Sequence, residues 1–436
     1  MEPGTSGRVG LGATALDDRR PVILGPRSGP GAWRLALLFG ALAFCQAIAE
    51  PADGLIAQPG LSLLKRWGHG PADLGLFSMG VGLAWAVKPA FGLLTDLVPL
   101  FGRRRRGYLM LAGGLAAGSM FALAVLPTPP ARYAWLMGWF AATALAWSFA
   151  DVVADALVID RGRPSALIGR LQAAQWGSAF AAGIVAGEGG GWLSEGGRER
   201  LGFATCGLAG AATLLLAAFA VRDPRVGRPT EGAGEAARAL GRAARSPTLL
   251  GVGAFLFLWN FNPFSTVVLY SHMTRALGID ERTFGRAQSA MALGSILGCL
   301  IYPRLARMAS GPVLIRLSIV LGVASTLAYA GLSGRASALA IGFAVGVIYM
   351  IATLIQLDLA ARSCPPEAAG TVFATLMALE NLAVALSTGL GSWCYDMAAD
   401  CRGASTAFQA LILISAALTA SSWLLRPSPG PGQTPE

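Results

Sequence analysis

Charge is scarce in this chain, and nearly all of its positive charge is arginine. Only 13% of the 436 residues are charged and 54% are hydrophobic, whereas a soluble protein carries about a quarter charged residues. The sequence holds two lysines, Lys65 and Lys88, and two histidines, His69 and His272. No pairing of a nucleophile with a base is apparent among them, so we do not expect an enzyme.

Motifs for nucleotides and metals are also missing. No G-x-x-x-x-G-K-[ST] loop occurs, which disfavours ATP hydrolysis by this chain. The six cysteines form no Cys-x-x-Cys or Cys/His cluster, so neither a metal nor another cofactor is expected. Cys394 and Cys401 flank a predicted outer loop, where a disulfide and two unpaired thiols remain alternatives.

Long apolar segments are what the sequence has in abundance. Stretches of about 20 mostly apolar residues recur along the chain, each long enough to cross a bilayer as a helix. We therefore predict an all-α membrane protein with about twelve transmembrane helices in two pseudo-symmetric six-helix bundles. The predicted spans are 34–57, 72–95, 107–127, 132–157, 167–192, 200–221, 248–270, 284–306, 312–331, 336–361, 367–394 and 404–425.

The spans divide the chain into five parts, and the arginines orient them. We predict a disordered cytoplasmic tail at 1–33, a first bundle at 34–221, a cytoplasmic linker at 222–247, a second bundle at 248–425 and a cytoplasmic tail at 426–436. This assignment places 23 Lys/Arg on one side, 10 on the other and Lys88 within the membrane. The positive-inside rule makes the richer side, with both termini, cytoplasmic, and it explains the net charge without a nucleic-acid partner.

One segment, KPAFGLLTDLVPLFGRRRRGY, places charges at and between two apolar spans. It begins at Lys88, which lies deep enough to bind an anionic substrate or to neutralise a carboxylate, although snorkelling to the interface is an alternative. A carboxylate at a helix end and guanidinium groups a loop away can form charge-assisted bonds that break when the bundles tilt. We predict a cytoplasmic gate here, with topological anchoring as the alternative. Its residues are Asp96, Arg103, Arg104, Arg105, Arg106, Asp160 and Arg161.

The fourth span carries two carboxylates on one face. Asp151 and Asp155 are four residues apart, and such a pair is costly in lipid unless it faces the bundle interior. We interpret them as a substrate or proton-coupling site, with a structural hydrogen-bond network as the alternative. The carboxylates Glu50 and Asp53, toward the outer end of the first span, are interpreted as solvated.

Further polar residues interrupt the other spans. The Asn-Phe-Asn-Pro sequence of the seventh span predicts a break that exposes backbone carbonyls toward an interior space. Glu380, near the middle of the eleventh span, is the second-half candidate for a coupled proton, with an interhelix hydrogen bond as the alternative. The remaining candidates for substrate or proton contact are Gln172, Gln175, Trp176, Asn260 and Asn262.

The amino-acid sequences of two segments resemble those of a known family. K-P-x-x-G-L-x-x-D-x-x-P-L-F-G-x-R-R-x-x-Y at 88–108 and D-V-V-x-D-x-x-V-x-x-R at 151–161 are similar to the folate–biopterin transporters of the major facilitator superfamily. Departures from the family pattern are Phe91, where a tyrosine is usual, and the residues Arg103 and Glu380.

The resemblance implies a secondary active transporter that works by alternating access on a folate- or pterin-like anion. The interior carboxylates favour coupling to protons. A related permease for muropeptides or other organic anions, or a non-transporting membrane assembly factor with the same fold, remains an alternative. We expect a monomer in a bacterial inner membrane.

Overall fold

The structure, a computed structural model, describes residues 30–100, 102–129, 131–162, 167–223, 241, 245–365 and 369–425. It gives only the backbone of Pro30, Asp96, Leu97, Gly162 and Ala369. The predicted tails beyond residues 30–33, and most of the predicted linker, lie outside the described residues.

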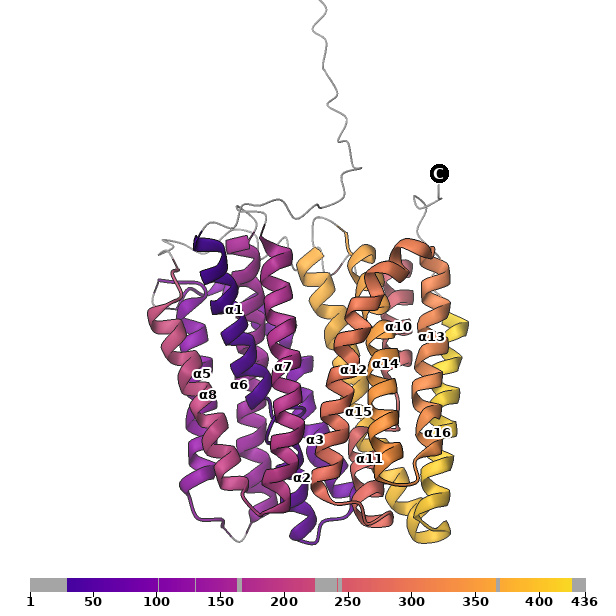
Figure 1. The fold of residues 1–436 in the computed structure, drawn as a ribbon. Coiled ribbons are helices and arrows are strands. Elements are labelled where there is room, and N and C mark those ends of the chain that lie inside the picture. Colours follow the sequence, from indigo (N-terminus) through magenta and orange to yellow (C-terminus); the bar gives the residue numbers. More distant parts are fainter. Residues whose placement is uncertain are drawn as a thin grey trace, which may run out of the picture.

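The described residues are helical apart from turns and one isolated β-bridge between Leu100 and Arg103. Figure 1 shows two bundles of helices standing side by side. The first bundle contains α1 (Pro30–Ala49), α2 (Ala57–Arg66), α3 (Pro71–Ala86), α4 (Lys88–Leu97), α5 (Arg106–Val125), α6 (Arg132–Gly162), α7 (Ile168–Glu195) and α8 (Glu199–Phe219). The second contains α10 (Pro247–Asn260), α11 (Thr266–Ser271), η2 (His272–Ala276), α12 (Glu281–Met308), α13 (Gly311–Ala328), η3 (Tyr329–Gly331), α14 (Arg335–Ser363), α15 (Ala369–Arg402), α16 (Ala404–Ser421) and η5 (Ser422–Leu425).

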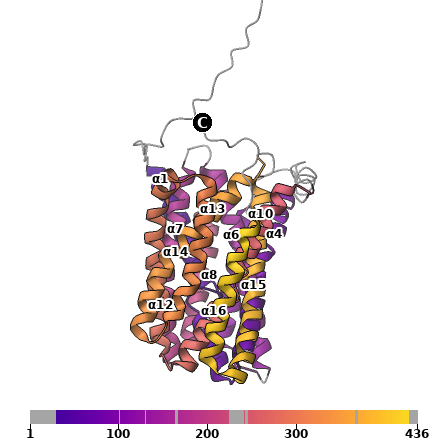
Figure 2. The same ribbon diagram turned by 90° about the vertical axis from the view of Figure 1, so that its right-hand side faces the viewer.

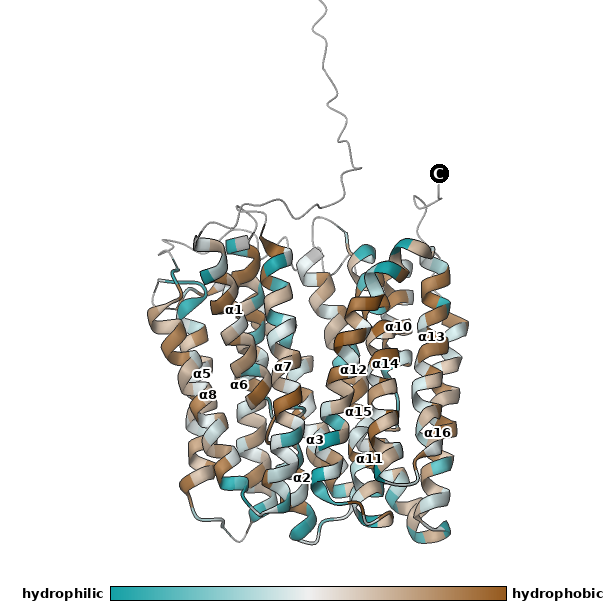
Figure 3. Cartoon of the chain, viewed as in Figure 1, coloured by the Kyte–Doolittle hydropathy of each residue, from teal (hydrophilic) through white to brown (hydrophobic). Residues whose placement is uncertain are grey.

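Ten helical segments of the described chain are long and apolar enough to cross a membrane. The charged and glycine-rich α7, and the short apolar α10 continued by α11, run alongside them (Figure 1). Figure 3 shows hydrophobic residues along the middle of the helices and hydrophilic residues gathered toward both ends. The predicted fold class, an all-α membrane protein in two bundles, is confirmed.

Within the described residues, two crossings are interrupted over several residues, and proline explains both of these breaks. Pro51 follows the end of α1, and Pro263 lies between α10 and α11. A proline has no backbone N–H to continue a helical ladder. The first predicted span ended at 57, but α2 continues that crossing to Arg66 because the chain resumes a helix after the break.

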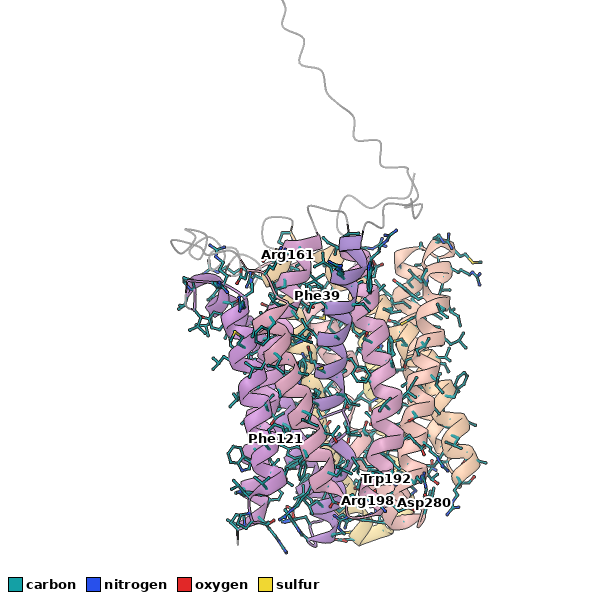
Figure 4. All side chains as sticks on the ribbon, turned by 60° about the vertical axis from the view of Figure 1, so that its left-hand side comes forward. Phe39, Phe121, Arg161, Trp192, Arg198 and Asp280 are labelled. Carbon is teal, nitrogen blue, oxygen red and sulfur yellow. The ribbon has the colours of Figure 1, made fainter. Side chains whose placement is uncertain are left out.

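We call the end of the bundles where α1 begins and η5 ends the terminal face, and the opposite end the distal face. Figure 4 places Arg161 near the terminal face and Trp192, Arg198 and Asp280 near the distal face. Figure 2, turned to bring the second bundle forward, shows the same two ends.

The two bundles meet most closely in the distal half. A Cβ added to Gly285 of α12 would lie 2.2 Å from the carbonyl oxygen of Gly187 of α7, and one added to Gly75 of α3 would lie 2.2 Å from Cβ of Ser392 of α15. Small residues at these crossings let the backbones approach, as is usual between transmembrane helices.

Candidate functional site

The first bundle brings five polar and aromatic side chains together near the break between α1 and α2. Asp151 of α6 accepts hydrogen bonds from Lys88 Nζ at 2.5 Å and from Gln46 Nε2 at 2.7 Å. Lys88 Nζ also lies 4.3 Å from the centroid of the Trp85 ring. The Trp85 indole N–H donates to Glu50 Oε1 at 3.1 Å. We call Gln46, Glu50, Trp85, Lys88 and Asp151 the central site.

The Lys88–Asp151 ion pair is shielded but reachable. The two side chains are 19% and 24% exposed. An ion pair in such a position keeps most of its attraction, because little water screens it. In this structure Lys88 neutralises Asp151.

Glu50 is buried, with 7% of its surface exposed, so its interpretation as a solvated carboxylate was wrong. Its second oxygen accepts the backbone N–H of Ala52 at 2.8 Å and of Asp53 at 2.6 Å. These are N–H groups that the break after α1 leaves without helical partners. The carboxylate therefore caps the break and fixes the indole of Trp85.

Two further carboxylates lie close to Lys88. The side chain of Asp155 is exposed, and it has Gln175 as a hydrogen-bonding neighbour. Glu380 comes from α15 in the second bundle, and Lys88 lies within electrostatic range of both carboxylates. Lys88 thus interacts electrostatically with acidic groups from both bundles.

The α7–α12 interface opens toward the terminal face. Gly187 meets Gly285 closely, and a Cβ on Gly183, one turn nearer the terminal face, would lie 3.5 Å from Cβ of Ala292. Two turns further along the same face of α7, Trp176 packs on Phe180 and is 52% exposed. Gln172, one turn beyond Trp176, is also exposed.

The break in the second bundle is held by amide side chains. Asn260 donates to Gln356 Oε1 at 3.0 Å and to the carbonyl of Leu256 at 2.9 Å. Asn262 donates to Thr326 Oγ1 at 3.0 Å and accepts the Phe264 N–H at 3.0 Å. The predicted break is present, and these two asparagines connect it to α13 and α14.

The arginine run ties together helix ends of the first bundle. Arg105 lies 3.6 Å from Asp160 Oδ2 and donates to Thr95 Oγ1 at 2.8 Å. Asp223 Oδ2 accepts the backbone N–H groups of Arg105 and Arg106, at 2.7 and 3.0 Å. The side chain of Asp96 lies outside the described residues. Arg103, Arg104 and Arg161 lie at the same end of the bundle.

A second polar cluster joins the two bundles near the distal face. Glu281, the first residue of α12, accepts hydrogen bonds from Lys65 Nζ, from Tyr270 Oη at 2.8 Å and from Gln58 Nε2 at 3.0 Å. Gln58 also donates to the Glu281 carbonyl at 2.7 Å. We call Gln58, Lys65, Tyr270 and Glu281 the distal latch. Sequence reasoning missed it, because no local pattern links α2 to α12.

Exposed ion pairs surround the distal latch. Glu188 of α7 pairs with Arg286 at 3.1 Å and Arg282 at 3.4 Å, and all three side chains are between 41% and 50% exposed.

All six cysteines are unpaired, Cys394 and Cys401 among them.

Comparison with known families decides what kind of protein carries this site. The sequence profile of the BT1 family matches residues 60–422, which is most of the chain. The chain belongs to the BT1 family. A folate-biopterin transporter of Synechocystis sp. is 31% identical over 345 residues, covering 74% of this chain and 68% of that protein. Folate transporter 2 of Plasmodium falciparum is 23% identical over 338 residues, covering 74% of this chain and 72% of that protein.

Solved structures show the same fold. A mutant of the nucleoside transporter NupG superposes on this BT1-family chain with a TM-score of 0.71 at 13% identity, covering 90% of this chain and 100% of that one. A bacterial homologue of the human lysosomal transporter Spinster, inward-facing and unoccupied, gives 0.66 at 14% identity, covering 91% and 98%. The BT1-family chain is a multi-pass membrane transporter with a major-facilitator fold, and its relatives are transporters rather than enzymes.

Proposed function

We propose that the protein is a proton-coupled secondary active transporter that moves a folate- or pterin-like anion by alternating access. The names of its relatives support the substrate class. The observation that carries the proposal is the Lys88–Asp151 ion pair, which Gln46 ties to α1 close to the break of the first crossing. Ionisable groups at such a depth are costly and mark transport pathways.

Lys88 is proposed to take the anionic group of the substrate. A substrate carboxylate or oxyanion would compete with Asp151 for the ammonium group. Asp151 would then be left without its cationic partner, and we propose that Asp151 and Asp155 carry the coupled proton. Substrate binding and protonation are thereby linked at one ion pair, and Glu380 supplies a third carboxylate from the second bundle.

The conformation described here is proposed to be the inward-open state. The distal latch and the glycine contacts close the distal half, whereas Trp176 and Gln172 are exposed in the terminal half. The arginine-rich terminal face would be cytoplasmic by the positive-inside rule. Both termini would then be cytoplasmic, in a bacterial inner membrane.

Asp96 and the arginine run are proposed to form the gate that closes the cytoplasmic side in the outward-open state. Their supporting observation is the Arg105–Asp160 pair, which already joins the ends of two helices. Asn260 and Asn262 are proposed to hold the backbone of the second break in place beside the substrate path. Gln172, Gln175 and Trp176 are proposed to line that path along α7. The protein is proposed to act as a monomer.

Uptake into proteoliposomes tests the proposal. Purified protein is reconstituted and supplied with labelled folate, biopterin or muropeptide, with and without a proton gradient. We expect gradient-stimulated uptake of folate or biopterin by the wild type, and a loss of at least tenfold in Asp151→Asn. Asp73→Asn is the matched control, because Asp73 pairs with His69 at 2.8 Å near the distal face and is 51% exposed. Uptake of muropeptide alone, or pteridine uptake indifferent to the gradient, would contradict the proposal.

A further inference from the structure

We propose that Trp85 is the surface on which the planar ring of the substrate stacks, and that Glu50 is a positioning residue that sets the orientation of this indole. The inference rests on the proposed function, since it requires a substrate with a planar aromatic ring. It adds two residues that the sequence pattern did not single out as part of the site.

A hydrogen bond from the indole N–H to Glu50 fixes the orientation of Trp85. Its indole N–H donates to Glu50, and the Glu50 carboxylate is itself held by the backbone N–H groups of Ala52 and Asp53. Those N–H groups belong to the break after α1, so the indole is tied to backbone rather than to another rotating side chain. A fixed ring loses little conformational freedom on binding, which favours affinity.

The face of Trp85 is occupied by a cation in the present state. Lys88 Nζ lies 4.3 Å from the ring centroid while it also pairs with Asp151. Trp85 itself is partly exposed. The ammonium group therefore lies over the Trp85 ring and within hydrogen-bonding distance of the Asp151 carboxylate at the same time.

A planar aromatic anion can satisfy both partners at once. Its ring would replace the ammonium group over the indole, and its anionic group would pair with the displaced Lys88. Stacking of a heterocycle on an aromatic side chain contributes binding affinity in other proteins. An aliphatic anion of equal charge could take Lys88 but would gain nothing from Trp85.

The chain offers a matched control for the aromatic–cation pair. Trp192 and Arg198 lie near the distal face, and the Arg198 guanidinium carbon is also 4.3 Å from its indole centroid (Figure 4). Trp192 is 38% exposed. The two tryptophans therefore share the local interaction and differ in their position relative to the central site.

The test measures uptake of folate, which carries both a pteridine ring and carboxylates, in proteoliposomes by the full chain. We expect Trp85→Leu to raise KM at least tenfold with kcat within threefold of wild type, and Trp85→Phe to raise KM about threefold, because a ring remains. Trp192→Leu should leave both constants within twofold. Inhibition of uptake by pterin should weaken in Trp85→Leu, whereas inhibition by 4-aminobenzoylglutamate, which lacks the pteridine ring, should weaken less.

The role of Glu50 is tested by a double-mutant cycle. Glu50→Gln should raise KM severalfold when Trp85 is present and have no effect on KM in the Trp85→Phe background, where no indole N–H exists. Equal effects in both backgrounds would overturn the positioning role.

The outcomes separate the inference from the proposed function. Wild-type uptake of pteridines with a KM in Trp85→Leu no higher than in Trp192→Leu would overturn the stacking role and leave the proposed function standing. A fall in kcat alone in both Trp85→Leu and Trp85→Phe would also overturn it. Absence of any pteridine or folate uptake by the wild type would overturn both.

Discussion

Replacing Glu281 by glutamine is expected to shift the protein toward the conformation in which the distal half opens. The Glu281 carboxylate accepts hydrogen bonds from Lys65, Tyr270 and Gln58, and its side chain is 12% exposed. Glutamine keeps one acceptor oxygen, so one neutral hydrogen bond can survive while the attraction to Lys65 is lost. Hydrogen bonds to charged groups are worth about 1.5–3 kcal/mol.

Partial exposure lowers that figure toward the bottom of its range. The Lys65 side chain is 23% exposed, so its ammonium group can turn to water when the carboxylate is gone. We therefore expect a change of about 2 kcal/mol, because part of the lost attraction is recovered by hydration. This corresponds to about a 30-fold change in the ratio of the two conformations.

The assay measures how fast a buried thiol becomes reactive. Ser392 is 0% exposed and packs against Gly75 at the distal α3–α15 crossing. Ser392→Cys, in a background whose six native cysteines are replaced by serine, should react slowly with a membrane-impermeant maleimide. Adding Glu281→Gln should speed the reaction about 30-fold, in proportion to the population that opens.

The exposed pairs around the latch provide the control. Glu188→Gln removes a carboxylate that is 45% exposed, and surface ion pairs contribute about 0–1 kcal/mol. Its effect on the labelling rate should stay below about fivefold. If Glu281→Gln reacts no faster than Glu188→Gln, the distal latch does not set the balance between the two conformations.

Two more predictions concern the interface and the ion pair. Gly285→Ala should also speed labelling of Ser392→Cys, because its Cβ would lie 2.2 Å from the Gly187 carbonyl oxygen, whereas Gly183→Ala, with 3.5 Å to its nearest neighbour, should not. Lys88→Met should lower the thermal unfolding temperature in detergent, because it leaves the Asp151 carboxylate with only Gln46, at a cost of about 2 kcal/mol. Lys88→Met combined with Asp151→Leu should regain much of that stability without regaining uptake, and an unchanged unfolding temperature in Lys88→Met would contradict a stabilising ion pair.

Sequence reasoning reached the fold and part of the central site. Apolar length is a local property, and it sufficed for the fold class of an all-α membrane protein. The i, i+4 spacing of Asp151 and Asp155 pointed to one face of α6, and Asp151 of that face pairs with Lys88. Lys88 was recognised because a lone lysine in an apolar segment is costly.

The missed residues depend on contacts between distant segments. Glu50 was taken as solvated because a continuous helix would have carried it outward, whereas the break at Pro51 turns it onto its own backbone. The role proposed for Trp85 follows only from its hydrogen bond to Glu50 and from the position of Lys88 over its ring. Glu281 stands 216 residues from Lys65, a separation that no periodic pattern can connect.

The glycine contacts between α7 and α12 have a consequence for the speed of the transport cycle. Where Gly187 and Gly285 meet, the contact is made by backbone and by the short side chain of Ser289, which donates to the Ile184 carbonyl at 2.7 Å. Closing such a contact costs less conformational entropy than freezing long side chains would. In the proposed alternating-access cycle, the two bundles can therefore separate and rejoin as rigid bodies, and the charged hydrogen bonds of the distal latch bias the equilibrium between the two conformations.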